Sequence, residues 1–120
     1  MHNPKSELQV DDVYALKSLA GCAEQGLHCD YCNTGELPQH VRQDDVPLSV
    51  LLSVMPGTKL RFMLNDGTLE TIELRIGDML VFRGDRCHAG CQYDYWNVRI
   101  HAYIDSTCCP RVRNTTHPCV

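Results

Sequence analysis

The stretch Thr58-KLRFMLNDGTLETIELRIGDMLV-Phe82 decides the fold class of this chain. It contains β-type runs that turn residues separate from one another, at 58–64, 68–75 and 79–82. Asn65-Asp66-Gly67 is a strong hairpin signal, and Gly77-Asp78 marks the next turn. Apolar residues follow no helical period here or elsewhere in the chain. The stretch therefore predicts short strands joined by tight turns.

The same pattern continues on both sides of this stretch. Further β-type runs occur at 13–19, 26–31, 48–54, 87–92 and 96–105, which brings the expected number of strands to eight. This spacing of short strands is typical of a sandwich or a small barrel. We therefore predict an all-β fold, and the length of 120 residues predicts a single domain over 1–120.

Two stretches interrupt the strand pattern. Residues 32–46 are polar and rich in turn residues, which predicts a lid-like loop. Residues 106–120 are irregular, with two prolines and three cysteines, and we expect an extended C-terminal arm rather than a ninth strand.

The composition argues against nucleic acids and membranes as binding partners. A net charge of -4 with scattered Lys and Arg argues against a nucleic-acid-binding face and against a polybasic membrane patch. The first residues contain no apolar stretch of a signal peptide, and no segment has the length of a membrane span. We therefore expect an intracellular, cytoplasmic protein. In that compartment its eight cysteines would be reduced rather than disulfide-bonded.

The last predicted strand alternates clearly between polar and apolar residues. One face carries Asn97, Arg99, His101 and Tyr103, and the other carries Val98, Ile100, Ala102 and Ile104. If the polar face points into a barrel, the apolar face points outward and needs a cover. We expect a second copy of the chain or an N-terminal segment to provide it.

Three residues form a candidate metal site. His28 and Asp30 end one predicted strand, and His88 begins another. Two histidines and one carboxylate are the ligand set that holds iron(II) with open positions on one face. Arg99 lies one strand beyond His88, and its guanidinium suits the carboxylate of an acidic co-substrate. Asn97 and Tyr103 are further candidates for cofactor binding, and Gln25 for orienting the ligands.

Taken together, four segments resemble the Fe(II)/2-oxoglutarate-dependent dioxygenases. They are Gln25–Asp30 (QGLHCD), Gly77–Phe82 (GDMLVF), His88–Gly90 (HAG) and Asn97–Arg99 (NVR). The resemblance covers nearly the whole chain, from 13 to 105. It implies a double-stranded β-helix, the jelly-roll or cupin-like barrel, with Fe(II), 2-oxoglutarate and O₂ as cofactor and co-substrates.

The resemblance also implies residue roles. His28, Asp30 and His88 would hold the iron, and Arg99 would bind the distal carboxylate of 2-oxoglutarate. Collagen-type prolyl hydroxylases typically have lysine at the position of Arg99. Alkylation-repair demethylases carry a second arginine beyond the anchor, where this chain has His101 and Tyr103. The implied activity is hydroxylation, with a small molecule or a protein side chain as the expected substrate.

The cysteines leave other interpretations open. Cys29 and Cys32 have zinc-knuckle spacing, and a four-ligand site could be completed from Cys108, Cys109, His117 and Cys119. Strand alternation should turn Cys29 away from the two iron ligands beside it. Cys22, Cys87 and Cys91 are expected to be buried small hydrophobic residues. The alternative function is therefore a metal-binding cupin-like barrel or a zinc-stabilised binding module without oxygenase activity.

Overall fold

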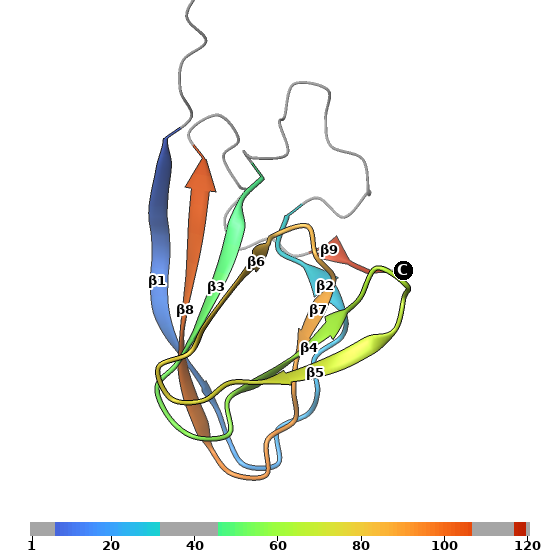
Figure 1. The fold of residues 1–120 in the computed structure, drawn as a ribbon. Helices are drawn as coiled ribbons and strands as arrows, with labels where there is room; N and C mark the ends of the chain where they lie inside the picture. Colours follow the sequence, from blue (N-terminus) through green and yellow to red (C-terminus); the bar gives the residue numbers. More distant parts are fainter. Residues whose placement is uncertain (1–6, 32–45, 107–116, 120) are drawn as a thin grey trace, which may run out of the picture.

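The computed structural model describes residues 7–31, 46–106 and 117–119 (Figure 1). The strands are β1 (Leu8–Ser18), β2 (His28–Cys29), β3 (Leu48–Ser53), β4 (Lys59–Met63), β5 (Leu69–Glu73), β6 (Met79–Arg83), β7 (His88–Gly90), β8 (Asn97–Ser106) and β9 (His117–Pro118). Within these ranges there is no helix long and apolar enough to cross a membrane. The predicted all-β class and its eight strands are confirmed, with a short ninth strand in addition.

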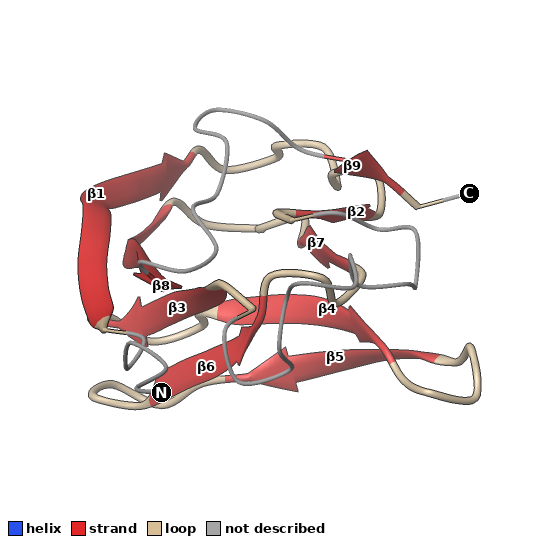
Figure 2. Cartoon of the chain, turned by 90° about the horizontal axis from the view of Figure 1, so that it is seen from above, coloured by secondary structure: helices blue, strands red, loops and turns tan. Residues whose placement is uncertain are grey.

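The strands form two sheets that face each other (Figures 1 and 2). The first sheet has the order β1-β8-β3-β6, and the second has the order β5-β4-β7-β2-β9. All pairings are antiparallel. Because the chain repeatedly crosses from one sheet to the other, neighbouring strands in each sheet are mostly distant in sequence. This arrangement is the jelly-roll expected from the sequence.

The predicted hairpin is present between β4 and β5. Leu64 N donates a hydrogen bond to Thr68 O at 2.8 Å, and Gly67 N donates one to Leu64 O at 2.9 Å. Gly67 has a φ of 84°, a left-handed conformation that glycine adopts without steric cost. The turn thereby sets the register in which Leu60 faces Ile72.

The hydrophobic core lies between the two sheets. Its buried members are Leu51, Leu60, Phe62, Leu74 and Phe82. The rings of Phe62 and Phe82 meet edge to face, with centroids 4.8 Å apart, in a geometry that aromatic pairs favour. Three of these side chains, Leu51, Leu60 and Phe82, line the same cavity as polar side chains of β8.

We expect Leu74→Ala to lower the free energy of unfolding by about 2–4 kcal/mol, since Leu74 is 8% exposed and truncation leaves a cavity. The matched control is Leu69→Ala at the other end of the same segment. Leu69 is 49% exposed, so its truncation should change stability by less than about 0.5 kcal/mol. Urea unfolding of the three proteins measures both values, and equal losses would contradict this account of the core.

The bounds of the first two strands differ most from the prediction. β1 begins five residues before the predicted run at 13, because a bulge between Asp11 and Tyr14 absorbs the two aspartates. Asp12 has a φ of 51° there, a conformation that aspartate tolerates. β2 contains only two residues of the predicted run 26–31.

The C-terminal arm also differs from the prediction. Ser106 still belongs to β8, and His117–Pro118 form a ninth strand on the edge of the second sheet, beside β2. A proline at a sheet edge loses no ladder hydrogen bond that the sheet needs. Residues 107–116, and 32–45 of the predicted lid, lie outside the described residues.

The predicted alternation of β8 is confirmed where it matters for the site. Asn97, Arg99 and His101 are 1%, 7% and 9% exposed and point between the sheets, whereas Val98 and Ile100 are half-buried on the outer face. On the same outer face Met79 and Val81 of β6 are 59% and 47% exposed. A cover for this face, by a second copy or an N-terminal segment, stays a prediction.

Candidate metal centre

Three side chains converge at one end of the second sheet. His28 on β2 lies opposite His88 on β7 in the strand pairing, and Asp30 follows β2 directly. One ligand atom from each residue lies within 4.8 Å of the others. His28 Nε2 is 3.8 Å from Asp30 Oδ1, and His88 Nε2 is 3.5 Å from Asp30 Oδ2. The structure therefore brings together the three residues that the sequence predicted as ligands.

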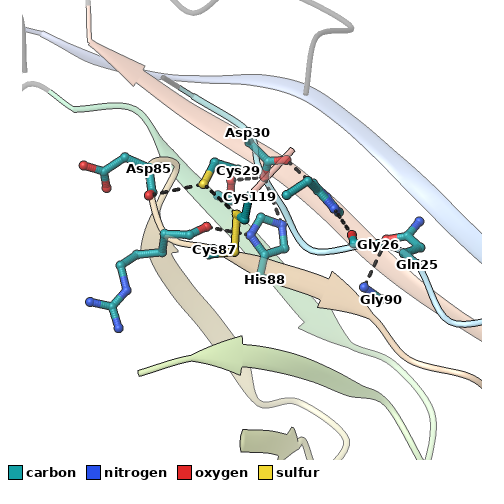
Figure 3. Close-up of polar contacts among 12 residues, drawn as sticks. Gln25, Gly26, Cys29, Asp30, Asp85, Cys87, His88, Gly90 and Cys119 are labelled. Atoms are coloured by element: carbon teal, nitrogen blue, oxygen red, sulfur yellow. Dashed lines mark hydrogen bonds and ion pairs between the residues drawn. A yellow bond between two sulfur atoms is a disulfide. The ribbon is translucent and has the colours of Figure 1, made fainter. Parts of the chain in front are cut away.

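Backbone carbonyls orient both imidazole rings. Nδ1 of His28 lies 2.9 Å from Gly26 O, and Nδ1 of His88 lies 2.9 Å from Arg86 O (Figure 3). A carbonyl oxygen only accepts hydrogen bonds, so Nδ1 carries the proton when the ring is neutral. The lone pair of each ring is then on Nε2, which faces Asp30. Such a partner on the second nitrogen is typical of histidines that bind metals.

Burial of His88 favours the neutral form of its imidazole ring. Removing this ring from water lowers the pKa of its imidazole, and the nearby charge of Asp30 and the bond to Arg86 O oppose the shift only in part. At neutral pH the His88 ring is therefore neutral. The neutral form is the one that binds a metal ion.

Sequence analysis missed two residues that position Asp30. Ser49 on β3 is fully buried and donates a hydrogen bond of 2.6 Å to Asp30 Oδ2. The backbone N–H groups of Asp30 and Tyr31 both donate to Gly84 O at 2.9 Å. A Cβ at Gly84 would lie 2.9 Å from Pro47 O, so only glycine fits this turn without a shift. The Arg83-Gly84-Asp85 tripeptide thus supports the metal site, a role that its sequence does not indicate.

The triad borders a cavity of about 290 Å³ between the sheets. Arg99 lines the same cavity, together with Tyr14, His101 and Tyr103 on the first sheet. The ring of Tyr14 stacks on His101 with centroids 5.2 Å apart, and His101 meets Tyr103 at 4.7 Å. The cavity therefore has a metal-binding wall on the second sheet and an aromatic and cationic wall on the first.

Arg99 is buried and held in place. Its Nη1 donates hydrogen bonds to Ser18 Oγ at 3.1 Å and to Asn97 Oδ1 at 3.3 Å. Its guanidinium carbon lies 5.1 Å from the centre of the Tyr93 ring. Among the described residues, no carboxylate forms an ion pair with it. A buried cation is costly without an anion, so this position suits an anionic ligand.

The other predicted site residues lie at different places. Tyr103 lines the cavity, whereas Asn97 is not among the lining residues and acts through Arg99. Asn97 Nδ2 in turn donates to Thr58 Oγ1 at 3.1 Å. Gln25 lines the cavity beside the triad, and its Oε1 accepts a hydrogen bond of 3.0 Å from Gly90 N.

The cysteines differ from the prediction of reduced thiols. Cys87 is not a free buried residue but forms a disulfide with Cys119. The sequence could not show this pairing, because it depends on β9 lying beside β2. Cys91 is buried and free as predicted, and burial raises the pKa of its thiol. Cys22 is free and only half-buried.

The predicted zinc ligands are only partly described. Cys29 lies beside Cys119, with 3.5 Å between the two sulfurs, and its side chain points away from the iron ligands as expected. Cys32, Cys108 and Cys109 lie outside the described residues, as does the side chain of His117.

Comparison with known proteins supports the fold. No family model and no curated protein matches the chain. Among solved structures, a prolyl-4-hydroxylase from Pseudomonas putida is 21% identical with a TM-score of 0.57, and the match covers 78% of this chain and 51% of that one. A cupin domain from Bordetella pertussis is 17% identical with a TM-score of 0.45, over 89% of this chain and 98% of that one.

At 21% identity the likeness to the hydroxylase concerns the fold alone, and this chain spans about half the length of that protein. The chain is therefore an all-β jelly-roll of the cupin-like, double-stranded β-helix type.

Proposed function

We propose that this protein is an Fe(II)- and 2-oxoglutarate-dependent oxygenase that hydroxylates its substrate. One observation carries the proposal: the His28, Asp30 and His88 triad and the buried Arg99 border the same cavity. The triad supplies ligands for the metal, and the arginine supplies a cation for the acid co-substrate.

The donor set fits iron(II). The imidazoles of His28 and His88 and the carboxylate of Asp30 would hold the ion, and this ligand type is the one that non-haem iron(II) oxygenases use. Ser49 fixes the carboxylate of Asp30 by a hydrogen bond to Oδ2 and leaves Oδ1 facing His28. When bound, iron(II) supplies the activation of O₂ and the oxidation of a C–H bond.

Arg99 would bind and orient 2-oxoglutarate. Its guanidinium can donate two parallel hydrogen bonds to a carboxylate, and it stays charged when buried. Ser18 and Asn97 accept hydrogen bonds from one of its nitrogens, so the guanidinium is positioned before the co-substrate binds. Leu51, Leu60 and Phe82 line the cavity and exclude water around the reacting groups.

The substrate would enter past the aromatic side chains of the first sheet. Tyr14 is 39% exposed while its ring stacks on the buried His101, so it lies where the cavity meets solvent. A cavity of about 290 Å³ has little room beyond the co-substrate. We therefore favour a small molecule or a single protein side chain over a nucleic acid.

The test uses the protein without oxygen. Adding Fe(II) and 2-oxoglutarate together should produce a weak metal-to-ligand charge-transfer band in the visible spectrum. On subsequent exposure to O₂ the protein should convert 2-oxoglutarate to succinate, and it should do so slowly even when the substrate to be hydroxylated is absent. Iron binding with neither the band nor succinate would overturn the proposal in favour of a metal-binding barrel without oxygenase activity.

A further inference from the structure

Three cysteines from distant parts of the chain meet on the far side of β2. Cys29 is on β2, Cys87 directly precedes β7, and Cys119 directly follows β9. Their sulfur atoms all lie within 4.8 Å of one another (Figure 3). Successive side chains of a strand point to opposite faces, so Cys29 points away from the cavity while its neighbours His28 and Asp30 border it. The cluster is therefore separate from the iron ligands.

The backbone holds each of the three sulfurs in place. β9 pairs with β2, and Cys119 N donates a hydrogen bond of 3.0 Å to Leu27 O. Cys29 is 2% exposed, and its thiol donates to Asp85 O at 3.4 Å. Cys87 is fixed by the pairing of β7 with β2 and β4. Groups placed by strands need little rearrangement to bind a ligand.

The described state of the cluster is oxidised, with a Cys87–Cys119 disulfide and the thiol of Cys29 beside it. The distance of 3.5 Å between the sulfurs of Cys29 and Cys119 is nevertheless close to the sulfur–sulfur distance in a zinc–thiolate site. In a tetrahedral zinc site with Zn–S bonds of about 2.3 Å, two thiolate sulfurs lie about 3.8 Å apart. Thiolates are soft ligands, which select zinc over iron(II) or magnesium.

We propose that Cys29, Cys87 and Cys119 form a second metal site, which binds Zn²⁺ when the disulfide is reduced. A dithiol reductant breaks the Cys87–Cys119 bond, gives two electrons and two protons to the two sulfurs, and becomes a disulfide itself. Zn²⁺ then replaces the three thiol protons, and water supplies the fourth ligand. Both forms link Cys119 to Cys87, next to β7, so this link is kept in reducing and in oxidising surroundings.

The site lies one residue from each iron ligand along the chain. Cys29 separates His28 from Asp30, and Cys87 precedes His88. Zinc would therefore link β2 to the start of β7 on the side opposite the cavity, next to the residues that would bind iron. The proposal does not depend on the oxygenase function, because its ligands and its metal are different.

Cadmium provides a direct test, because thiolate-bound Cd²⁺ absorbs in the ultraviolet and Cd²⁺ on histidine and carboxylate does not. The full chain is reduced with a phosphine, since dithiols compete for metals, and is titrated with Cd²⁺ and then with Zn²⁺. We expect one equivalent of Cd²⁺ to produce the band and Zn²⁺ to compete for the site. Cys29→Ser should weaken binding at least about 100-fold, whereas Cys91→Ser, which changes a buried cysteine outside the cluster, should not.

Alkylation keeps the proposal testable if Cys29→Ser fails to fold. In the reduced wild-type chain, Zn²⁺ should protect Cys29, Cys87 and Cys119 from a thiol reagent, and peptide mass spectrometry identifies them. The His88→Ala variant should keep both the band and the protection, even if iron binding is lost. Absence of the band in the reduced wild-type chain, or protection of a different set of cysteines, would overturn the proposal.

Discussion

Asp30→Asn should greatly weaken iron(II) binding while leaving the fold intact. The amide has nearly the shape of the carboxylate and can still accept the hydrogen bond from Ser49. It lacks the negative charge, however, and is a poor ligand for a hard divalent cation. Loss of one ligand of three should lower the affinity at least about 100-fold, since even supporting residues cost 10–100-fold.

Thermal unfolding under anaerobic conditions measures this effect. At an iron concentration of about 100 times Kd, binding should stabilise the wild-type protein by about 2.7 kcal/mol, and a 100-fold weaker site leaves about 0.4 kcal/mol. For a domain of this size the difference corresponds to a shift in Tm of several degrees. Asp94→Asn, an exposed carboxylate away from the cavity, is the control and should keep the full shift. An equal shift in Asp30→Asn would show that the triad does not bind the metal.

Much of this site could be predicted because it depends on strand periodicity. The alternation of β8 placed Arg99 and His101 on the inward face, and both are buried. Similarly, the hairpin at Asn65–Gly67 follows from local turn chemistry and needs no information from the rest of the chain. Strand order brings His28 and His88, which the resemblance implied as iron ligands, opposite each other.

Features that depend on contacts between distant segments could not be predicted. Ser49 and Gly84 support Asp30 from two other parts of the chain, and neither belongs to a recognisable motif. The disulfide required β9, a strand of two residues with a proline, to pair with β2. No local pattern marks so short a strand, since its stability comes from the neighbour and the cross-link.

The bulge in β1 shows a third limit. The strand predicted from the sequence begins at 13, directly after Asp11 and Asp12, and aspartate is a residue type common in turns. The structure instead continues the pairing with β8 on both sides of the bulge, from Leu8↔Ser106 to Ser18↔Asn97. A long partner strand can thus override a local signal for a turn.

Arg99→Met should raise the KM for 2-oxoglutarate sharply without affecting iron(II) binding. Methionine is a flexible apolar side chain that can occupy much of the space of the arginine stem, but it cannot bind a carboxylate. Removing one partner from a buried charge pair typically costs about 2–5 kcal/mol. At about 3 kcal/mol, the expected increase in KM is roughly 150-fold.

Two further variants separate charge from geometry at this position. Arg99→Lys keeps the charge but loses the planar fork of donors, so its KM should lie between those of the wild type and Arg99→Met. Arg75→Met, on a turn where the arginine side chain is 95% exposed, is the control and should leave the KM unchanged.

Arg99→Met and Asp30→Asn should affect different binding steps, the first that of 2-oxoglutarate and the second that of iron(II). Arg99 lies on β8 of the first sheet, whereas the triad lies on and beside β2 and β7 of the second. The charge-transfer band in Arg99→Met should therefore reappear at high 2-oxoglutarate, because the metal is still bound. In Asp30→Asn the band should stay absent at any 2-oxoglutarate concentration. An unchanged KM in Arg99→Met would show that the co-substrate carboxylate binds elsewhere, and the buried guanidinium would then need another anion to offset its loss of hydration.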